Sequence, residues 1–260
     1  MANNESIKKT IIVTLLLCLV CSVIVSVTAI LLRPIQNANK TLDFKRNILM
    51  VSGLYQEGMN VEQTFTQQIT RKVVDLNTGL FSDAVDPVSY DQRAAAKDPA
   101  MSIELSEEQD IVSIGRRENY SVVYFVVENG HFKTIVLPVK GYGLWSTLYG
   151  FIALKADANT VDSIIFYQHA ETPGLGGEVD NPKWRALWAN KEVYGADANV
   201  ALKVIKGHVD AAAPTAKHQV DGLAGATLTS KGVDNMVQFW LGENGYKNFL
   251  NHLKSGAAKL

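Results

Sequence analysis

The longest hydrophobic stretch lies near the start of the chain. From Thr10 to Leu32 there is no charged residue, and a helix of this length would be about 34 Å long, enough to cross a bilayer. A buried core helix would be expected to show a polar face, and the apolar run is longer than that of a typical signal peptide. We therefore predict an uncleaved transmembrane helix over residues 10–32, preceded by a short cytoplasmic N-terminus, residues 1–9.

Apolar residues after this span recur at intervals of three and four, the spacing of one helix face. They are Phe44, Ile48, Val51 and Tyr55, and then Val61, Phe65, Ile69 and Val73. Residues 77–100 show no such period and contain Gly79, Pro87 and Pro99, which is typical of irregular structure. We expect residues 33–120 to form a membrane-proximal helical and irregular region.

Short runs of β-branched and aromatic residues begin at Ser121 and predict strands. The runs cover residues 122–127, 134–139, 151–154, 161–167 and 202–205. Asn129-Gly130 lies between the first two runs and favours a two-residue hairpin turn. The sheet is therefore expected to be at least partly antiparallel.

Two helices are predicted within this second region. Asn181-Pro182 is a helix-start signal, with Trp184, Leu187 and Trp188 on the expected buried face. A longer helix is expected just after Ser230, where apolar residues recur as Val233, Met236, Val237, Trp240 and Leu241. The predicted fold is α+β: one N-terminal transmembrane helix, followed by a mixed, partly antiparallel sheet ectodomain packed with helices.

Charge and cysteine content narrow the function classes. The 260 residues carry a formal net charge of −1, with Lys and Arg scattered, so there is no basic footprint for nucleic acid. Both cysteines, Cys18 and Cys21, lie inside the predicted span, so the rest of the chain contains no thiol. Basic residues flank both ends of the span, and charge counting leaves its orientation undecided.

Side-chain catalysis and metal binding find little support in the sequence. There is no Gly-x-Ser-x-Gly elbow and no His-Glu-x-x-His, and the five histidines lack metal-ligand spacing. The glycines from Gly174 to Gly177 are followed by Glu178 and a proline-started helix, not by the strand and helix context of a dinucleotide fingerprint. We predict no catalytic side chain and no metal site.

The segment from Asp221 to Ser230 joins small residues to the start of the last long helix. Gly225 and Ala226 allow a ligand to approach the backbone closely, and the N-terminus of a helix favours an anion such as phosphate. The hydroxyl of Thr227 would lie beside that anion. From the residues alone, a structural turn with Thr229 or Ser230 as the N-cap is the favoured interpretation.

Gly225-Ala226-Thr227, with Asp221 before it, resembles the Asp-x-x-Ser-Gly-Ala-Thr motif of the covalent FMN-binding domain family. In that family a flavin transferase moves FMN from FAD onto the last threonine and forms a phosphoester. The resemblance implies that Thr227 carries FMN through its phosphate, and that residues 121–260 form the FMN-binding domain. Ala224 stands where the family usually has Ser or Thr.

Other segments extend the resemblance over nearly the whole chain. Gly143-Leu144-Trp145-Ser146 and residues 171–178, Glu-Thr-Pro-Gly-Leu-Gly-Gly-Glu, are similar to the C subunits of bacterial sodium-translocating NADH:quinone oxidoreductases. The G subunits of Rnf electron transport complexes share the anchor, the Glu-Thr-Pro-Gly turn and the threonine motif. The Gly-Leu-Trp-Ser segment and residues 239–242 favour the first of these two families.

The resemblance and the chemistry of the side chains together give a set of expected flavin contacts. Trp145 and Leu175 offer apolar faces for the isoalloxazine ring, although Trp145 could equally belong to the core. Thr172 offers a hydroxyl, and Glu171 could accept a hydrogen bond from the ring or ribitol or be a solvated turn carboxylate. The remaining expected contacts adjoin these residues or Thr227: Leu144, Ser146, Gly225, Ala226, Leu228 and Thr229.

The function implied by the resemblance is electron transfer. Electrons from NADH-oxidising subunits would pass through this FMN to a second flavin and then to ubiquinone, coupled to sodium export. The implied partners are the other membrane and NADH-oxidising subunits, the flavin transferase and membrane lipid. The expected location is the bacterial inner membrane with the C-terminal domain in the periplasm. The alternatives are the Rnf-type protein and a non-redox membrane-anchored binding or assembly module.

Overall fold

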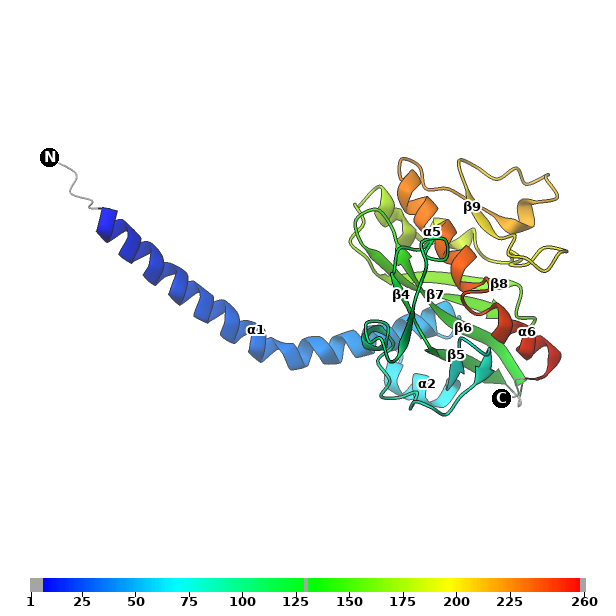
Figure 1. Cartoon of the computed structure of the whole chain (residues 1–260), viewed down its shortest axis with the longest axis horizontal. Coiled ribbons are helices and arrows are strands. Elements are labelled where there is room, and N and C mark those ends of the chain that lie inside the picture. The colour runs from blue at the N-terminus through cyan, green and yellow to red at the C-terminus, as the bar shows by residue number, and fades with distance from the viewer. Residues whose placement is uncertain (1–6, 129–130, 258–260) are drawn as a thin grey trace. The chain divides into compact units, whose positions relative to one another are not determined.

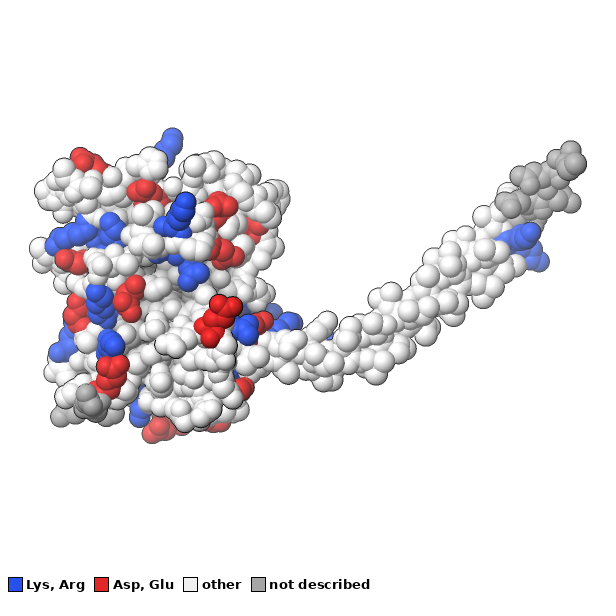
Figure 2. Space-filling model, turned by 180° about the vertical axis from the view of Figure 1, so that it is seen from behind, with Lys and Arg blue, Asp and Glu red and all other residues white. Residues whose placement is uncertain are grey.

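Helix α1 (Ile7–Val51) contains the predicted membrane span. The computed structural model describes residues 7–128 and 131–257, and the chain divides into two compact units, Met1–Phe44 and Lys45–Leu260. Within the described residues, α1 is the one helix long and apolar enough to cross a membrane, and the apolar segment that qualifies is not buried in the protein. Its surface over residues 10–32 carries no Lys, Arg, Asp or Glu, whereas basic and acidic residues intermingle on the second unit (Figure 2).

The second unit contains the last turns of α1 and all later elements (Figure 1). Its helices are α2 (Val61–Gln68), α3 (Gln92–Ala95), α4 (Pro182–Ala186), α5 (Thr227–Trp240) and α6 (Lys247–Ser255), with 3₁₀ turns η1 (Gly176–Asp180) and η2 (Ala216–His218). Its strands are β1 (Ile69–Asp75), β2 (Leu80–Phe81), β3 (Ser102–Glu104), β4 (Arg116–Glu118), β5 (Tyr120–Glu128), β6 (His131–Tyr142), β7 (Thr147–Lys155), β8 (Val161–Gln168), β9 (Lys203–Ile205) and β10 (Gln219–Asp221).

Six strands form the main sheet in the order β2-β1-β5-β6-β7-β8, with antiparallel neighbours throughout. Strand side chains alternate between the two faces, and both faces of the sheet carry buried apolar residues. On one side Phe81 contacts Phe125 and Phe249 of α6 edge-on, and on the other Phe65 of α2 contacts Tyr124. Two smaller sheets pair β3 with β4 antiparallel and β9 with β10 in parallel.

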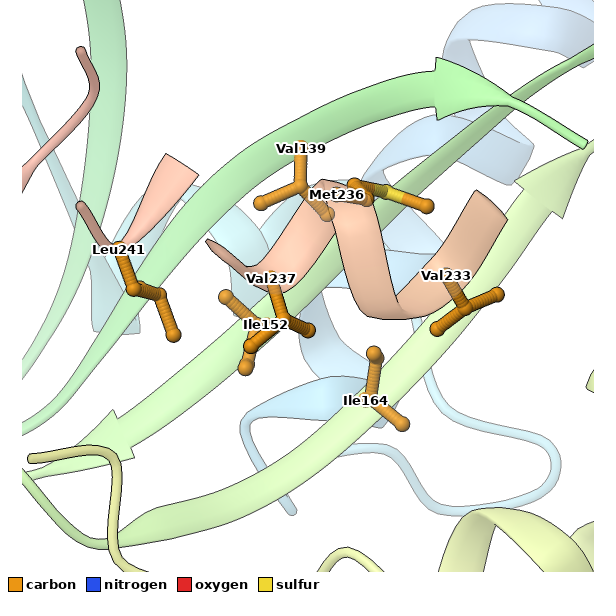
Figure 3. A pocket seen from close by; sticks show the side chains of 7 residues that line it. All are labelled: Val139, Ile152, Ile164, Val233, Met236, Val237 and Leu241. Carbon is orange, nitrogen blue, oxygen red and sulfur yellow. The ribbon is translucent and has the colours of Figure 1, made fainter. Parts of the chain in front are cut away.

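Helix α5 packs its apolar face on the same side of the sheet as Phe125. Figure 3 shows Val233, Met236 and Val237 of α5, and Leu241 directly after it, facing the strands. The facing side chains are Val139 of β6, Ile152 of β7 and Ile164 of β8. The lining is apolar throughout, so this is core packing and not a ligand site. Packing across the sheet fixes where the first turn of α5 lies.

The strands β5 and β6 separate beyond the pair Tyr124–Val136, where the main-chain ladder between them ends. The carbonyls of β6 that face the gap receive side-chain donors instead. Tyr246 donates its hydroxyl to the Pro138 carbonyl at 2.8 Å, and Trp240 donates its indole N–H to the Lys140 carbonyl at 2.6 Å. A proline is tolerated at position 138 because the N–H that it lacks would face this unpaired side.

The helical prediction for residues 61–73 is wrong in its second half. Residues 61–68 form α2, but Ile69 and Val73 lie in β1, which pairs along its whole length with β5. A spacing of four residues keeps side chains on one face in a strand as well as in a helix, so it does not separate the two. The region 33–120 therefore contributes two strands, β1 and β2, to the main sheet.

The start of the last long helix also differs from the prediction. It begins at Thr227 and not after Ser230. Neither Thr229 nor Ser230, the two candidate capping residues, caps the helix. The Thr229 hydroxyl donates to Glu171, and the Ser230 hydroxyl accepts the N–H of Leu223. Around the shorter helix α4, the expected burial is confirmed for Trp184 and Trp188, whereas Leu187 is 39% exposed; Leu187 and Trp188 lie after the helix end.

The strand predictions from residue 122 onward are confirmed. Residues 77–100, expected to be irregular, also contain the short elements β2 and α3, and Tyr55, expected on the first helix face, lies beyond the end of α1. The four runs expected from residue 122 onward lie in β5, β6, β7 and β8, and the run at 202–205 contains β9. The α+β class and the antiparallel pairing are as expected. The predicted turn at Asn129-Gly130 lies outside the described residues.

The hydrogen bonds from Trp240 and Tyr246 to the carbonyls of β6 lead to a first prediction. The substitution Tyr246→Phe removes the hydroxyl that serves Pro138 and lies 2.7 Å from the Ser121 hydroxyl, leaving buried polar groups unpaired. We expect the free energy of unfolding to fall by about 1–3 kcal/mol. Denaturant unfolding of the detergent-solubilised chain measures it. Tyr142→Phe, at an exposed position, should change it by less than about 0.5 kcal/mol.

Candidate functional site

Thr227 is the first residue of α5 and is exposed to solvent. Ala226 precedes it as the N-cap and has no side chain that could cap the helix. Gly225 before that has φ +73°, a left-handed conformation that glycine adopts without strain. The small residues of the motif therefore bring the chain into the helix without covering its first turn.

The first turn of α5 presents N–H groups without partners. Among the hydrogen bonds of the described residues, none uses the N–H of Thr227, Leu228 or Thr229. The first main-chain bond of the helix runs from the N–H of Ser230 to the carbonyl of Ala226. Unpaired N–H groups and the positive end of the helix dipole favour an anion at this place.

Two other segments meet this turn: the loop Gly143–Ser146 between β6 and β7, and the turn from Glu171 to Gly177 after β8. Glycines permit the close approach. A Cβ on Gly176 would lie 2.5 Å from the Thr229 hydroxyl oxygen, and one on Gly225 would lie 3.1 Å from Leu175 Cδ2. The structure thus brings together the three segments in which the sequence predicts flavin contacts.

Glu171 joins these segments. Its carboxylate accepts the N–H groups of Leu144 (3.1 and 3.2 Å to the two oxygens), Trp145 (3.0 Å) and Ser146 (3.3 Å). The Thr229 hydroxyl donates to its second oxygen at 2.7 Å. The residue is 5% exposed. The solvated-carboxylate interpretation is therefore wrong, and the acceptors expected to face the flavin already have donors within the protein.

The pKa of Glu171 reflects this surrounding. Burial raises the pKa, but the bond from the Thr229 hydroxyl and the N–H groups of Trp145, Leu144 and Ser146 outweigh it. The result is a pKa below the ordinary value of 4.5. Each of these donors stabilises the charged form, so the carboxylate is ionised at neutral pH.

Apolar side chains around the first turn of α5 are exposed. Trp145 is 66% exposed, Leu228 60%, Leu175 45% and Leu144 39%. The interpretation of Trp145 as a core residue is therefore wrong. Exposed apolar groups that come from separate segments and gather at one place are typical of a binding site.

The polar residues of the predicted set take different positions. The Ser146 hydroxyl accepts the N–H of Ala170, and its carbonyl accepts the N–H of Gly143, so this residue closes the loop. Thr172 is exposed, and its carbonyl accepts the N–H groups of Leu175 and Gly177, which confirms the expected tight turn. Its hydroxyl has no hydrogen bond among the described residues.

Asp221, the first residue of the threonine motif, fixes the chain segment that leads to α5 through bonds to three other residues. Its carboxylate accepts the N–H of Val209 at 2.8 Å and lies 2.7 Å from His208 Nδ1. Its carbonyl accepts the indole N–H of Trp184 at 2.8 Å. The sequence does not indicate these contacts, nor the bonds of Glu171, because their partners are distant along the chain. No group of three His, Cys, Asp or Glu residues is placed to hold a metal within residues 7–128 and 131–257.

The family match to known proteins includes the three segments that form this site. Residues 143–242 match the FMN-binding domain family. The C subunit of a Na(+)-translocating NADH-quinone reductase from Pseudomonas aeruginosa is 56% identical over 99% of this chain and 100% of its own length. The chain belongs to this family of C subunits. The corresponding protein from Vibrio vulnificus is 48% identical over 98% of this chain and 99% of its own.

Solved structures of this family share the fold. The structure of NqrC from Shewanella oneidensis matches with a TM-score of 0.77 at 32% identity, covering 84% of this chain and 99% of that one. The C subunit of the Na(+)-translocating NADH-quinone reductase from Parabacteroides distasonis matches with a TM-score of 0.66 at 27% identity over 84% and 96%. Membership of the family, together with the apolar part of α1, fits a membrane-anchored component of a larger complex.

The lowered pKa of Glu171 leads to a second prediction. A group whose pKa is lower in the folded state stabilises the fold above its unfolded pKa and loses that effect as the pH falls through the folded value. We expect Glu171→Gln to reduce the free energy of unfolding by about 1–3 kcal/mol near neutral pH. The difference from wild type should shrink as the pH falls below 4.5. Denaturant unfolding across this range measures it, and a difference that grows on acidification would contradict the assignment.

Proposed function

We propose that this chain is the electron-carrying subunit of a sodium-translocating NADH:quinone oxidoreductase and holds FMN as a phosphoester on Thr227. The single observation that carries the attachment is the exposed hydroxyl at the first residue of α5, beside N–H groups that have no partner among the described residues. The match of residues 143–242 to FMN-binding domains supports the choice of cofactor.

The phosphate fits the first turn of α5 by charge and by space. Gly225 and Ala226 place no bulky side chain over the turn, and the N–H groups and helix dipole stabilise negative charge there. A phosphate joined to the Thr227 oxygen needs no side-chain cation, because main-chain donors meet it.

The ring fits the exposed apolar residues around that turn. Trp145 and Leu175 lie in separate loops and are free to contact a planar ring, with Leu144 and Leu228 beside them. The Thr172 hydroxyl is available to its polar edge, and Ser146 keeps the loop closed. Glu171 and Thr229 lie beneath this surface. They support it through the bonds from the loop N–H groups to Glu171 and the bond from Thr229 to Glu171.

Attachment is a group transfer that a flavin transferase carries out. The Thr227 oxygen forms a bond to the flavin-side phosphorus of FAD, the pyrophosphate bond breaks, AMP leaves, and the hydroxyl proton is released. The bond involves the phosphate and leaves the ring unsubstituted, so the surrounding residues set its redox properties. Tethering maintains a high effective concentration of the cofactor at the site.

The electron path and the topology follow from the same proposal. Electrons from NADH-oxidising subunits reach this flavin and continue to a second flavin and ubiquinone in other membrane subunits. Residues 1–9 lie in the cytoplasm, residues 10–32 cross the lipid of the inner membrane, and residues 33–120 with the FMN-binding domain, residues 121–260, lie in the periplasm. The uncharged stretch of α1 supports the span.

The attachment leads to a third prediction. Thr227→Val removes the hydroxyl, so the chain co-expressed with its flavin transferase should lose all flavin fluorescence in a denaturing gel. Thr227→Ser keeps a hydroxyl at the same place and should retain the fluorescence. Intact mass gives the same answer independently. A fluorescent Thr227→Val band would move the attachment to another residue.

A further inference from the structure

The main chain of Trp145 is held by Glu171, whereas its indole is exposed. Its side chain is 66% exposed, and no hydrogen bond or ring contact of that side chain occurs among the described residues. Its N–H, by contrast, donates to Glu171 together with those of Leu144 and Ser146. Three successive N–H groups aimed at one point form an anion-binding nest, and here the anion is a carboxylate of the chain itself.

The space around this carboxylate leaves no room for a side chain at position 143 or 176. A Cβ on Gly143 would lie 2.6 Å from one carboxylate oxygen, and a Cβ on Gly176 would lie 2.7 Å from the other. Both distances are shorter than any ordinary contact. The two glycines therefore allow the loop 143–146 and the turn 171–177 to close on Glu171 from two sides.

A further bond of Glu171 reaches the helix that begins at Thr227. Thr229 is 1% exposed, and its hydroxyl donates to the carboxylate at 2.7 Å. Thr227 lies two residues earlier in the same turn and is exposed. One carboxylate thus connects the main chain of Trp145 to the turn that bears the predicted attachment residue.

Resting on the proposed function, we propose that Glu171 is a positioning residue that holds the indole of Trp145 against the flavin tethered to Thr227. It acts through the N–H groups of residues 144–146 and the hydroxyl of Thr229 and need not touch the flavin itself. Glutamine in its place has one acceptor oxygen. When that oxygen accepts the three N–H groups, the NH₂ replaces the oxygen that accepts from the Thr229 hydroxyl and faces the N–H of Leu144, so the connection between the loop and α5 is weakened.

Flavin fluorescence of the folded protein tests this positioning, because an indole stacked on a flavin quenches its emission. The full-length chain is co-expressed with the flavin transferase as wild type, Glu171→Gln, Trp145→Phe and the double variant. We expect each to carry one FMN by intact mass. Folded Glu171→Gln should fluoresce several-fold more strongly than wild type, approaching Trp145→Phe, and all four should become equal on unfolding.

The double variant shows whether the two residues act together. If Glu171 works by holding Trp145, the substitution Glu171→Gln should add no further fluorescence once the indole is gone. The matched control is Glu178→Gln, which removes the same charge from the neighbouring turn, where Glu178 bonds to the Asn181 side chain. It should leave the fluorescence of the folded protein at the wild-type level.

A second measurement needs no flavin. In the Thr227→Val chain, amide hydrogen exchange at Leu144, Trp145 and Ser146 should be faster when Glu171→Gln is added, and unchanged when Glu178→Gln is added. This arm reports on the hold that Glu171 has on the loop, whether or not Thr227 is the attachment residue.

The outcomes separate this inference from the proposed function. A wild-type chain without FMN after co-expression overturns the proposed function and the flavin role of Glu171 with it. A flavin-bearing Glu171→Gln chain with wild-type fluorescence overturns the positioning role alone, as does unchanged amide exchange in the loop. A folded Glu171→Gln chain that lacks FMN while wild type carries it assigns Glu171 to the modification reaction and also overturns the positioning role.

Discussion

Packing of α5 across the main sheet is the constraint on which the rest of the site depends. The helix buries Val233, Met236 and Val237 against three strands, so its axis and its ends are fixed by the core and not by the loops around them. Its first turn consequently lies next to the loop 143–146 and the turn 171–177. The exposed position of Thr227 thus follows from apolar burial further along the same helix.

Polar groups near this turn fall into two classes. Those beneath the surface are paired within the chain: Thr229 with Glu171, and Ser230 with Leu223. Those at the surface, the N–H groups of the exposed residues Thr227 and Leu228, are left without partners among the described residues. A buried N–H without a partner destabilises a fold, whereas one at an open helix end is available to a ligand. This division allows the fold around the site to be stable while the first turn of α5 can still bind a ligand.

The sequence predicts those features that depend on local pattern. The strands from residue 122 follow from runs of β-branched and aromatic residues, and the apolar face of α5 follows from a periodicity of 3.6 residues; both are present. The spacing of Ile69 and Val73 suits a helix and a strand equally, and pairing of β1 with β5 decides the outcome. Local pattern places the start of α5 too late, because Thr229 and Ser230 are ordinary capping residues whose hydroxyls are engaged elsewhere.

Candidate site residues were predictable as a set, but not in their roles. The three segments are recognisable from short motifs, and the structure brings them together. The bonds of Glu171 to residues 144–146 and 229 join positions 25 to 58 residues apart, and no local rule connects them. Glycines at positions 143 and 176 were the available signal, because both leave room that any side chain would fill.

The gap between β5 and β6 bears on biosynthesis. Its polar groups are matched by Trp240 and Tyr246, which are synthesised after every strand of the main sheet. A nascent chain ending before them has completed every strand of the main sheet while the Pro138 and Lys140 carbonyls still lack these donors. Pairing of these two carbonyls therefore follows synthesis of the whole sheet. Chains released by premature termination before Trp240 would expose the unpaired carbonyls of β6 to neighbouring molecules.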